Sequence, residues 1–319
     1  MVQRRIQPMV EGGILSAIAI IFAFISAYLP VLGPFVNLIW PVPMILLGVR
    51  HGYKWSLLAT VAAGLLIALL MHPLHALSVV VGFGLIGIVL GHAFRSDFAP
   101  GKTMIWGTAA SLLSKAAIIG LGIVVTGINP LDMGNTMTKT VEQAIDLYRG
   151  MGMSEEQLAQ VKESMQTVMK LVPLVLPTGF FMAAIVDTYL NFLVAKAVLR
   201  KLGHTVQEFP PFKHWTMPLA VVYAFAFALV GIYWGQSREI QLLYQAGMNL
   251  QVLASCMLFL QGMALIYFLA DKYNLSRLTR GIILVLVFTN GWFAQIVIFA
   301  GVFDLVADYR RLRTPRSME

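Results

Sequence analysis

The sequence predicts an all-α polytopic membrane protein. Hydrophobic residues make up 58% of the chain and charged residues 12%, and the mean hydropathy is +0.78. Several apolar runs reach the roughly 20 residues that a helix needs to cross the hydrocarbon core of a bilayer. Lipid offers no partners to the backbone polar groups of open sheets and bare loops, so we expect these runs to be helices.

The first apolar run, Gly12–Pro30, follows Arg4 and Arg5, which predict a cytoplasmic N-terminus. Small residues recur in this run at spacings of three and four, namely Gly12, Ser16, Ala19, Ala23 and Ser26, and Ala27 lies four residues beyond Ala23. On a helix they form one smooth stripe, against which another helix can pack closely in lipid. The stripe therefore predicts a docking helix, whose neighbour is either an external partner or a later helix of the same chain.

Five more predicted spans complete a six-span N-terminal bundle, residues 1–202. Four prolines in Leu29–Pro43 preclude a regular helix there, and a short second span follows them. The next three spans are expected at Trp55–Met71, Ala76–Phe94 and Met104–Thr126. Pro173 and Pro177 are predicted to mark the start of the sixth span, which ends at the basic cluster of Lys196, Arg200 and Lys201.

An extracytoplasmic helical insertion is expected at residues 128–170, between the fifth and sixth spans. A first amphipathic helix is predicted from the shared face of Met137, Val141, Ile145 and Tyr148. Ser154-Glu-Glu-Gln157 then matches a capping box, which predicts the start of a second short helix.

Residues 203–319 are predicted to hold two further spans, Trp215–Trp234 and Met248–Ala270, and a basic cytoplasmic tail. The last apolar run, Gly281–Val306, would place the tail arginines outside if it crossed the membrane once, against the charge rule. Thr289-Asn290-Gly291 interrupts this run. We therefore favour a re-entrant C-terminal hairpin over a single crossing.

Two ionisable residues fall at the middle of predicted spans, where a charge costs roughly 2.5–3.5 kcal/mol on insertion scales. They are Lys115 in the fifth span and Asp187 in the sixth. Consecutive helices are usually neighbours, so we expect the two side chains to pair, with Asn191 one turn away on the face of Asp187. The pair is either part of a polar ligand site or a buried structural ion pair.

Several kinds of site are not expected. The net charge of +8 is explained by the Lys and Arg of cytoplasmic loops, so no nucleic-acid partner is predicted. His72 and His75 lack an accompanying carboxylate or Cys, so no metal site is predicted. We find no Walker pattern and no nucleophile–base arrangement, and we therefore expect neither a cofactor nor an enzymatic activity. Asp304 and Asp308, at the inner end of the last helix, are expected to form interfacial charge pairs with the arginines beside them.

Five segments together resemble the YybS-type bacterial membrane proteins over nearly the whole chain. They are EGGILSAIAIIFAFISAYLPVLG, IWPVPMILLGVRHGYKWSLLAT, the G-x-G-x-x-G-x-x-x-G pattern of the fourth span, FAPGKTMIWGTAASLLSK and GVFDLVADYRRLR. The resemblance implies the six-span fold of the substrate-binding (S) components of energy-coupling-factor vitamin transporters. In those proteins an A-x-x-x-A motif on the first helix contacts the coupling subunit, and Ala19, Ala23 and Ala27 match this motif. S components lack a counterpart of the residues from Gly203 onward, and no vitamin-specific signature is present.

Two functions of different classes follow. The first is a substrate-binding and uptake component of the bacterial cell membrane for a small molecule, which depends on a separate coupling membrane subunit with ATPases. Its unidentified ligand would reach Asn37, Lys115 and Asp187 from outside, with Asn191 beside them. The alternative is a non-transporting scaffold that contacts cell-envelope or division proteins, as the rod-shape protein MreD does.

Overall fold

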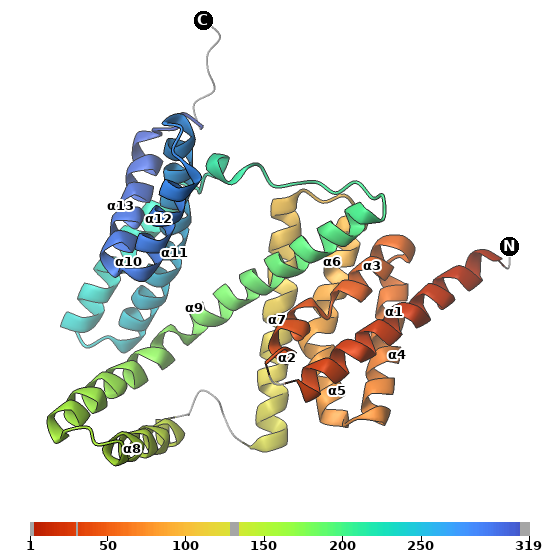
Figure 1. Cartoon of the computed structure of the whole chain (residues 1–319), viewed down its shortest axis with the longest axis horizontal. Coiled ribbons are helices and arrows are strands. Elements are labelled where there is room, and N and C mark those ends of the chain that lie inside the picture. Colours follow the sequence, from red (N-terminus) through yellow and green to blue (C-terminus); the bar gives the residue numbers. More distant parts are fainter. Residues whose placement is uncertain (1–2, 30, 128–133, 313–319) are drawn as a thin grey trace, which may run out of the picture. The chain divides into compact units, whose positions relative to one another are not determined.

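The computed structural model describes residues 3–29, 31–127 and 134–312, and every regular element within these ranges is a helix (Figure 1). The chain forms two compact units. The first comprises residues 1–158 and 179–208, and the second comprises residues 159–178 and 209–319. The division into domains at residues 202 and 203 stays a prediction.

Seven helical segments within the described residues are long and apolar enough to cross a membrane, one of them running from Pro73 to Arg95 through three of the elements named below, and a bent C-terminal pair would add an eighth if it counts as one span. This confirms a polytopic membrane protein built from helices. The helices up to residue 201 are α1 (Gln3–Tyr28), α2 (Gly33–Ile39), α3 (Val42–His51), α4 (Tyr53–Leu70), α5 (Pro73–Val79), the π-helix η1 (Val80–Gly84), α6 (Leu85–Arg95), α7 (Pro100–Thr126), α8 (Gly134–Gly150) and α9 (Glu155–Lys201).

The predicted second span is the short helix α3, which has 10 residues and is therefore about 15 Å long. It cannot cross a hydrocarbon core of about 30 Å by itself. Prolines at the starts of α2 and α3 divide this stretch into two short helices. Met44, Ile45 and Leu47 of α3 are fully buried, so α3 is a core element of the first unit.

Glycines of the fourth predicted span allow close packing of α6 on α3. A Cβ atom at Gly91 would lie 3.0 Å from the carbonyl oxygen of Ile45 and 3.1 Å from the Cα of Gly48. These distances are shorter than nearly all real Cβ contacts, so the two backbones approach as closely as they do only because both positions are glycine.

The acidic segment after α7 differs from its prediction in one respect. Helix α8 matches the first amphipathic helix, and Ser154 begins α9 with a complete capping box to Gln157. However, α9 does not stop before the apolar stretch that begins at Leu171. The whole helix has 47 residues and runs through Pro173 and Pro177, so neither proline begins a new helix, although the stretch that is apolar enough to cross a membrane begins beside them, at Leu171.

The side chain of Asn249 explains why α9 continues past Pro177. Its Oδ1 accepts hydrogen bonds from the backbone N–H of Thr178 (3.0 Å) and from the Thr178 hydroxyl (2.7 Å). Its Nδ2 donates to the carbonyl oxygen of Leu174 at 2.6 Å. A neighbouring side chain thus satisfies backbone groups next to the prolines, which is how membrane helices tolerate proline.

The second unit contains the 3₁₀ turn η3 (Phe212–His214), α10 (Ala220–Ser237), α11 (Gln241–Lys272), α12 (Arg277–Thr289) and α13 (Gly291–Ala307). The break between α12 and α13 lies at the predicted Thr289-Asn290-Gly291, and the chain bends there by 106°. Asn290 accepts a hydrogen bond from the N–H of Trp292 at 3.0 Å and so begins α13. The last apolar run is therefore not one straight crossing.

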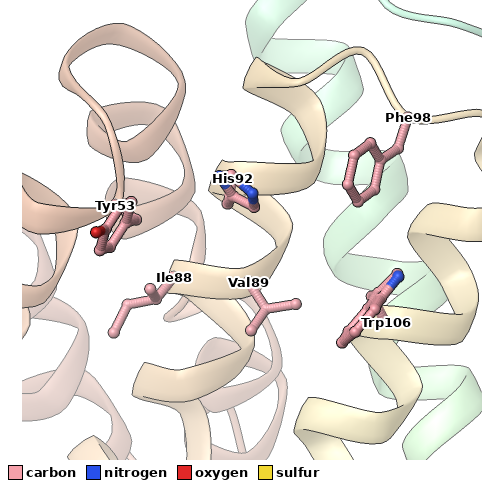
Figure 2. A pocket seen from close by; sticks show the side chains of 6 residues that line it. All are labelled: Tyr53, Ile88, Val89, His92, Phe98 and Trp106. Carbon is pink, nitrogen blue, oxygen red and sulfur yellow. The ribbon is translucent and has the colours of Figure 1, made fainter.

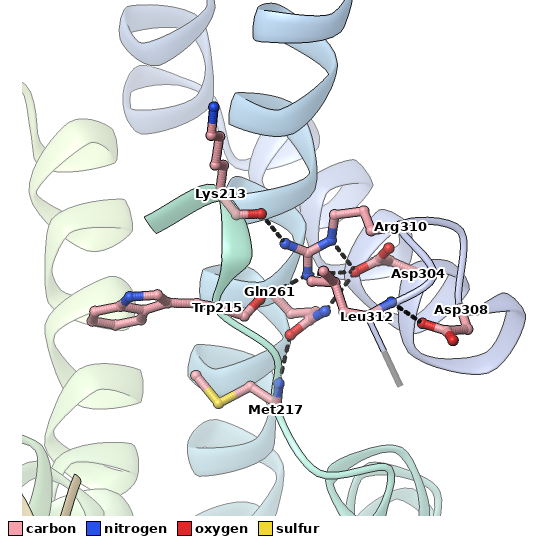
Figure 3. Close-up of polar contacts among 8 residues, drawn as sticks. All are labelled: Lys213, Trp215, Met217, Gln261, Asp304, Asp308, Arg310 and Leu312. Carbon is pink, nitrogen blue, oxygen red and sulfur yellow. Dashed lines mark hydrogen bonds and ion pairs between the residues drawn. The ribbon is translucent and has the colours of Figure 1, made fainter. Parts of the chain in front are cut away.

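A buried polar network joins η3, α11 and the end of α13 (Figure 3). Arg310 pairs with Asp304 at 2.7 Å, and both side chains are at most 3% exposed. Arg310 also donates to the carbonyl oxygens of Lys213 (2.6 Å) and Trp215 (2.8 Å). Gln261 donates to Asp304 and accepts from the N–H of Met217. The expected pairing of Asp304 with a nearby arginine is confirmed, as a buried pair.

Candidate functional site

The first unit contains a polar cluster between α7 and α9. Lys115 Nζ lies 2.9 Å from Asp187 Oδ2, which confirms the predicted pair. Ser111 completes a triangle, since its hydroxyl donates to the same carboxylate oxygen at 2.7 Å and accepts from Lys115 Nζ at 2.7 Å. One carboxylate oxygen thus receives two hydrogen bonds, one of which comes from a cation.

Helical spacing places these groups together. Ser111 and Lys115 are four residues apart on α7, and Asp187 and Asn191 are four residues apart on α9, so each pair shares one face. Asn191 Nδ2 donates to Asp187 Oδ1 at 3.1 Å and to the Asp187 carbonyl oxygen at 2.9 Å. Both oxygens of the carboxylate are therefore held in place.

The cluster is charge-neutral and unequally exposed. The side chain of Asp187 is 2% exposed and that of Lys115 is 23% exposed, so the cation is the accessible member of the pair. Two buried polar atoms at the cluster or beside it, Asn191 Oδ1 and Ser114 Oγ, have no hydrogen-bond partner among the described residues. Buried polar groups normally have partners, so this site retains capacity for a bound polar group.

A small cavity lies further along the same helix. It has a volume of about 190 Å³ and is lined by Leu74, Leu77 and Ser78 of α5 and by Ile118, Leu121, Gly122 and Val125 of α7. Ile118 and Gly122 follow Lys115 by three and seven residues, so they lie close to its face of α7. The cavity is mostly apolar, and a polar group would find Lys115 one turn away along α7.

Asn37 lies on α2 and is half-buried. Among the described residues no hydrogen bond joins it to Lys115, Asp187 or Asn191, and its Oδ1 is buried without a partner. The structure thus brings three of the four predicted ligand residues together. A ligand role for Asn37, like that of the other three, stays a prediction.

The alanine stripe of α1 divides between the interior and the surface. Ala19 and Ala23 are fully buried, and Trp40 Nε1 donates to the carbonyl oxygen of Ala19 at 2.9 Å. Ala27 is exposed. Two of the three alanines therefore pack against other helices of the chain. This favours a later helix of the same chain over an external partner as the neighbour of this stripe.

Sequence reasoning missed the two serines, Ser111 and Ser114, and an ionic cluster around Glu11 of α1. Ser111 and Ser114 stand four residues and one residue before Lys115, and a search for hydroxyls on its face would have found Ser111. Glu11 Oε2 lies 3.0 Å from both Arg50 Nη1 and His51 Nε2. This cluster could have been predicted, because the start of the first apolar run, with Glu11, and the basic loop with Arg50 and His51 were both expected on the cytoplasmic side.

Comparison with known proteins shows the family of the chain. The "Uncharacterized protein YybS" of Bacillus subtilis (strain 168) is 26% identical over 306 residues, which cover 95% of this chain and 97% of that protein. No solved structure matches the chain. Residues 17–305 match the family described as "Predicted membrane protein (DUF2232)", and the match leaves out only the start of α1 and the last two residues of α13 among the spans described above. The chain is an integral multi-pass membrane protein and belongs to the DUF2232 family.

Proposed function

We propose that this protein binds a small polar molecule in the bacterial cell membrane and serves in its uptake. The observation that carries the proposal is the cluster of Lys115, Asp187 and Asn191 in the interior of a membrane bundle. Ionisable groups at membrane depth are costly, and they are most often kept where they serve a substrate or ion pathway.

The geometry supports a ligand with a polar or charged group and a small apolar part. An anionic group would interact with the partly exposed Lys115, and a hydrogen-bond donor would be accepted by Asn191 Oδ1. The cavity along α7, at about 190 Å³, is smaller than the roughly 300–1,000 Å³ of pockets for drug-sized ligands. We therefore propose a ligand smaller than most vitamins.

The proposal assigns no chemical reaction to the chain. Energy for uptake would come from a separate coupling subunit with ATPases, as the resemblance to S components implies. Both termini would be cytoplasmic, so the outer end of α7, at Thr126, would face the outside together with the cavity. Because Ala19 and Ala23 are buried, Ala27 is the motif alanine that we propose to contact a coupling subunit.

A binding experiment tests the proposal. The wild-type chain and the double variant Lys115→Met/Asp187→Leu are purified in the same detergent, and co-purifying small molecules are compared by mass spectrometry. We expect a polar small molecule with the wild type and its loss with the variant, while the variant remains folded. The double variant Asp304→Leu/Arg310→Met removes a buried ion pair of the second unit, and it should retain the molecule.

One observation favours the scaffold as a second candidate. The burial of Ala19 and Ala23 leaves little of the stripe that the resemblance assigns to the coupling subunit. If cell-envelope proteins co-purify in stoichiometric amounts and no small molecule is found, the uptake proposal is wrong and the scaffold is supported.

A further inference from the structure

A second, larger cavity lies in the first unit, away from the Lys115–Asp187 cluster (Figure 2). Its volume is about 420 Å³, within the range of small-molecule sites. Three elements and a loop line it: Tyr53 begins α4, Ile88, Val89 and His92 lie on α6, Phe98 lies in the loop before α7, and Trp106 lies on α7.

The lining indicates contact with lipid at the level of the membrane interface. His92 makes edge-on contacts with the rings of Tyr53 (6.1 Å) and Phe98 (6.0 Å). Tyr53 and Trp106 are each about half exposed, and Ile105 next to Trp106 is 71% exposed. Tyr and Trp concentrate where the hydrocarbon meets the headgroups, because one part of each ring system is apolar and the other polar.

A cation stands at one side of this cavity. Lys102 Nζ lies 3.8 Å from the centroid of the Phe98 ring, and no ion pair joins Lys102 to a carboxylate in the described ranges of the chain. It also lies in the first turn of α7, where the helix dipole disfavours a positive charge and favours an anion.

Neighbouring charges add to this preference. Lys54 follows Tyr53 directly, and Arg95 follows His92 by one helical turn, with its guanidinium donating to the Val49 carbonyl oxygen at 3.1 Å. Asp97 is the acidic residue of the loop between α6 and α7. Three cations against one carboxylate leave this end of the helices positive, which complements a phosphate.

We propose that this cavity binds an anionic phospholipid, with one acyl chain against Val89 and Trp106 and the phosphate at Lys102. The chemistry of the site argues for a lipid over a soluble anion, because nearly all of the lining is apolar and the cation lies only at its margin. It argues for an anionic lipid because no carboxylate among the described residues pairs with Lys102, and a zwitterionic headgroup would compensate its charge poorly.

Native mass spectrometry of the full chain in detergent tests this proposal, with phosphatidylglycerol and phosphatidylcholine of equal acyl length as probes. We expect preferential retention of phosphatidylglycerol. Lys102→Gln should reduce that preference roughly fivefold, as expected for one lysine near an anionic surface, and Lys102→Arg should restore it. Lys272→Gln is the matched control, because Lys272 also lies over aromatic rings, those of Tyr273 and Tyr309, but belongs to the second unit, whereas Lys102 contacts the lining residue Phe98.

A second pair of variants tests the acyl chain. Val89→Trp fills the cavity and should reduce retention of both lipids, whereas Leu113→Trp, at a 63% exposed position of α7, should not. Equal retention of the two lipids by the wild type would overturn the proposal. So would unchanged retention in Lys102→Gln, or unchanged retention in Val89→Trp.

Discussion

Asp187 shows at the scale of single residues how a carboxylate is kept in the interior of a membrane bundle. It receives hydrogen bonds from Ser111, Lys115 and Asn191, so that both carboxylate oxygens have partners. Moving two charges out of water costs several kcal/mol each, and a buried pair repays this only with good geometry and additional hydrogen bonds. The pair is therefore stable as a unit but sensitive to the loss of either member.

Replacing Lys115 alone should strongly destabilise the protein. Lys115→Met leaves the carboxylate of Asp187 buried without its cation, and we expect a loss of about 3–5 kcal/mol in the free energy of unfolding in detergent. Adding Asp187→Leu should recover most of this loss, because no uncompensated charge remains. Lys196→Met, which breaks the more exposed pair with Glu208, should cost at most about 1 kcal/mol. A double variant no more stable than Lys115→Met would contradict this account.

Arg310 forms a buried ion pair in the second unit, so its replacement should also leave a carboxylate buried without its cation. Arg310→Met removes the partner of buried Asp304 and the donors to the carbonyl oxygens of Lys213 and Trp215. We expect a loss of about 3–5 kcal/mol, measured as a lower unfolding temperature in detergent. Arg311→Met changes the adjacent, exposed arginine and should have little effect. Similar unfolding temperatures for the two variants would show that the buried network does not stabilise this unit.

At the scale of helices, α11 and α13 pack closely because glycines stand where they cross. A Cβ atom at Gly262 would overlap the carbonyl oxygen of Val297, and one at Gly301 would overlap that of Leu258. Lipid and side chains are equally apolar, so association in a membrane depends on such close packing.

Gly301→Ala should therefore separate α11 from α13 and lower the free energy of unfolding by about 1–3 kcal/mol, the usual cost of overpacking. Gly281→Ala provides the control, because a Cβ atom there meets nothing within 4 Å. It should leave stability unchanged or raise it by up to about 1 kcal/mol through helix propensity. Both values can be measured by chemical unfolding in mixed micelles, and equal effects of the two substitutions would contradict the packing argument.

Asn249 is expected to stabilise α9 next to its prolines. Asn249→Leu removes the bonds to Thr178 and Leu174, so the amides that follow Pro177 should exchange hydrogen faster. Gln251→Leu is the control on the same helix, since no hydrogen bond of the Gln251 side chain to another described residue is found. Unchanged exchange at residues 178–180 in Asn249→Leu would show that α9 continues through its prolines for another reason.

At the scale of the whole molecule, the path of the C-terminal segment decides the topology. The 106° bend between α12 and α13 fits a re-entrant hairpin, which would keep Arg310 and Arg311 on the cytoplasmic side with the N-terminal arginines. We expect a green fluorescent protein fused after Glu319 to fluoresce and alkaline phosphatase at the same place to be inactive. Fusions after Arg238, in the turn between α10 and α11, should give the opposite results. Active phosphatase after Glu319 would mean that the last run crosses the membrane.

Most of the fold could be predicted because hydrophobic length and charge act locally along the chain. The positions of α1, α4, α7 and α11, and the break at Thr289-Asn290-Gly291, follow from the length of apolar runs and from residues that interrupt helices. The continuation of α9 through Pro173 and Pro177 could not be predicted, because it depends on an amide more than 70 residues away.

Part of the candidate site could likewise be predicted from the sequence, and part could not. The pairing of Lys115 with Asp187 could be predicted from their matching depths in consecutive spans, since a lone charge in lipid is costly. The sequence by itself thus determines that the protein is a membrane protein, that Lys115 pairs with Asp187, and which segments are long and apolar enough to span the membrane, except that the predicted second span is the short helix α3. Only the tertiary structure decided that Ala19 and Ala23 face the interior, that Ser111 completes the cluster and that Lys102 stands beside an apolar cavity. The physical reason is that a small-residue stripe or an exposed lysine can accept several neighbours, and packing selects one.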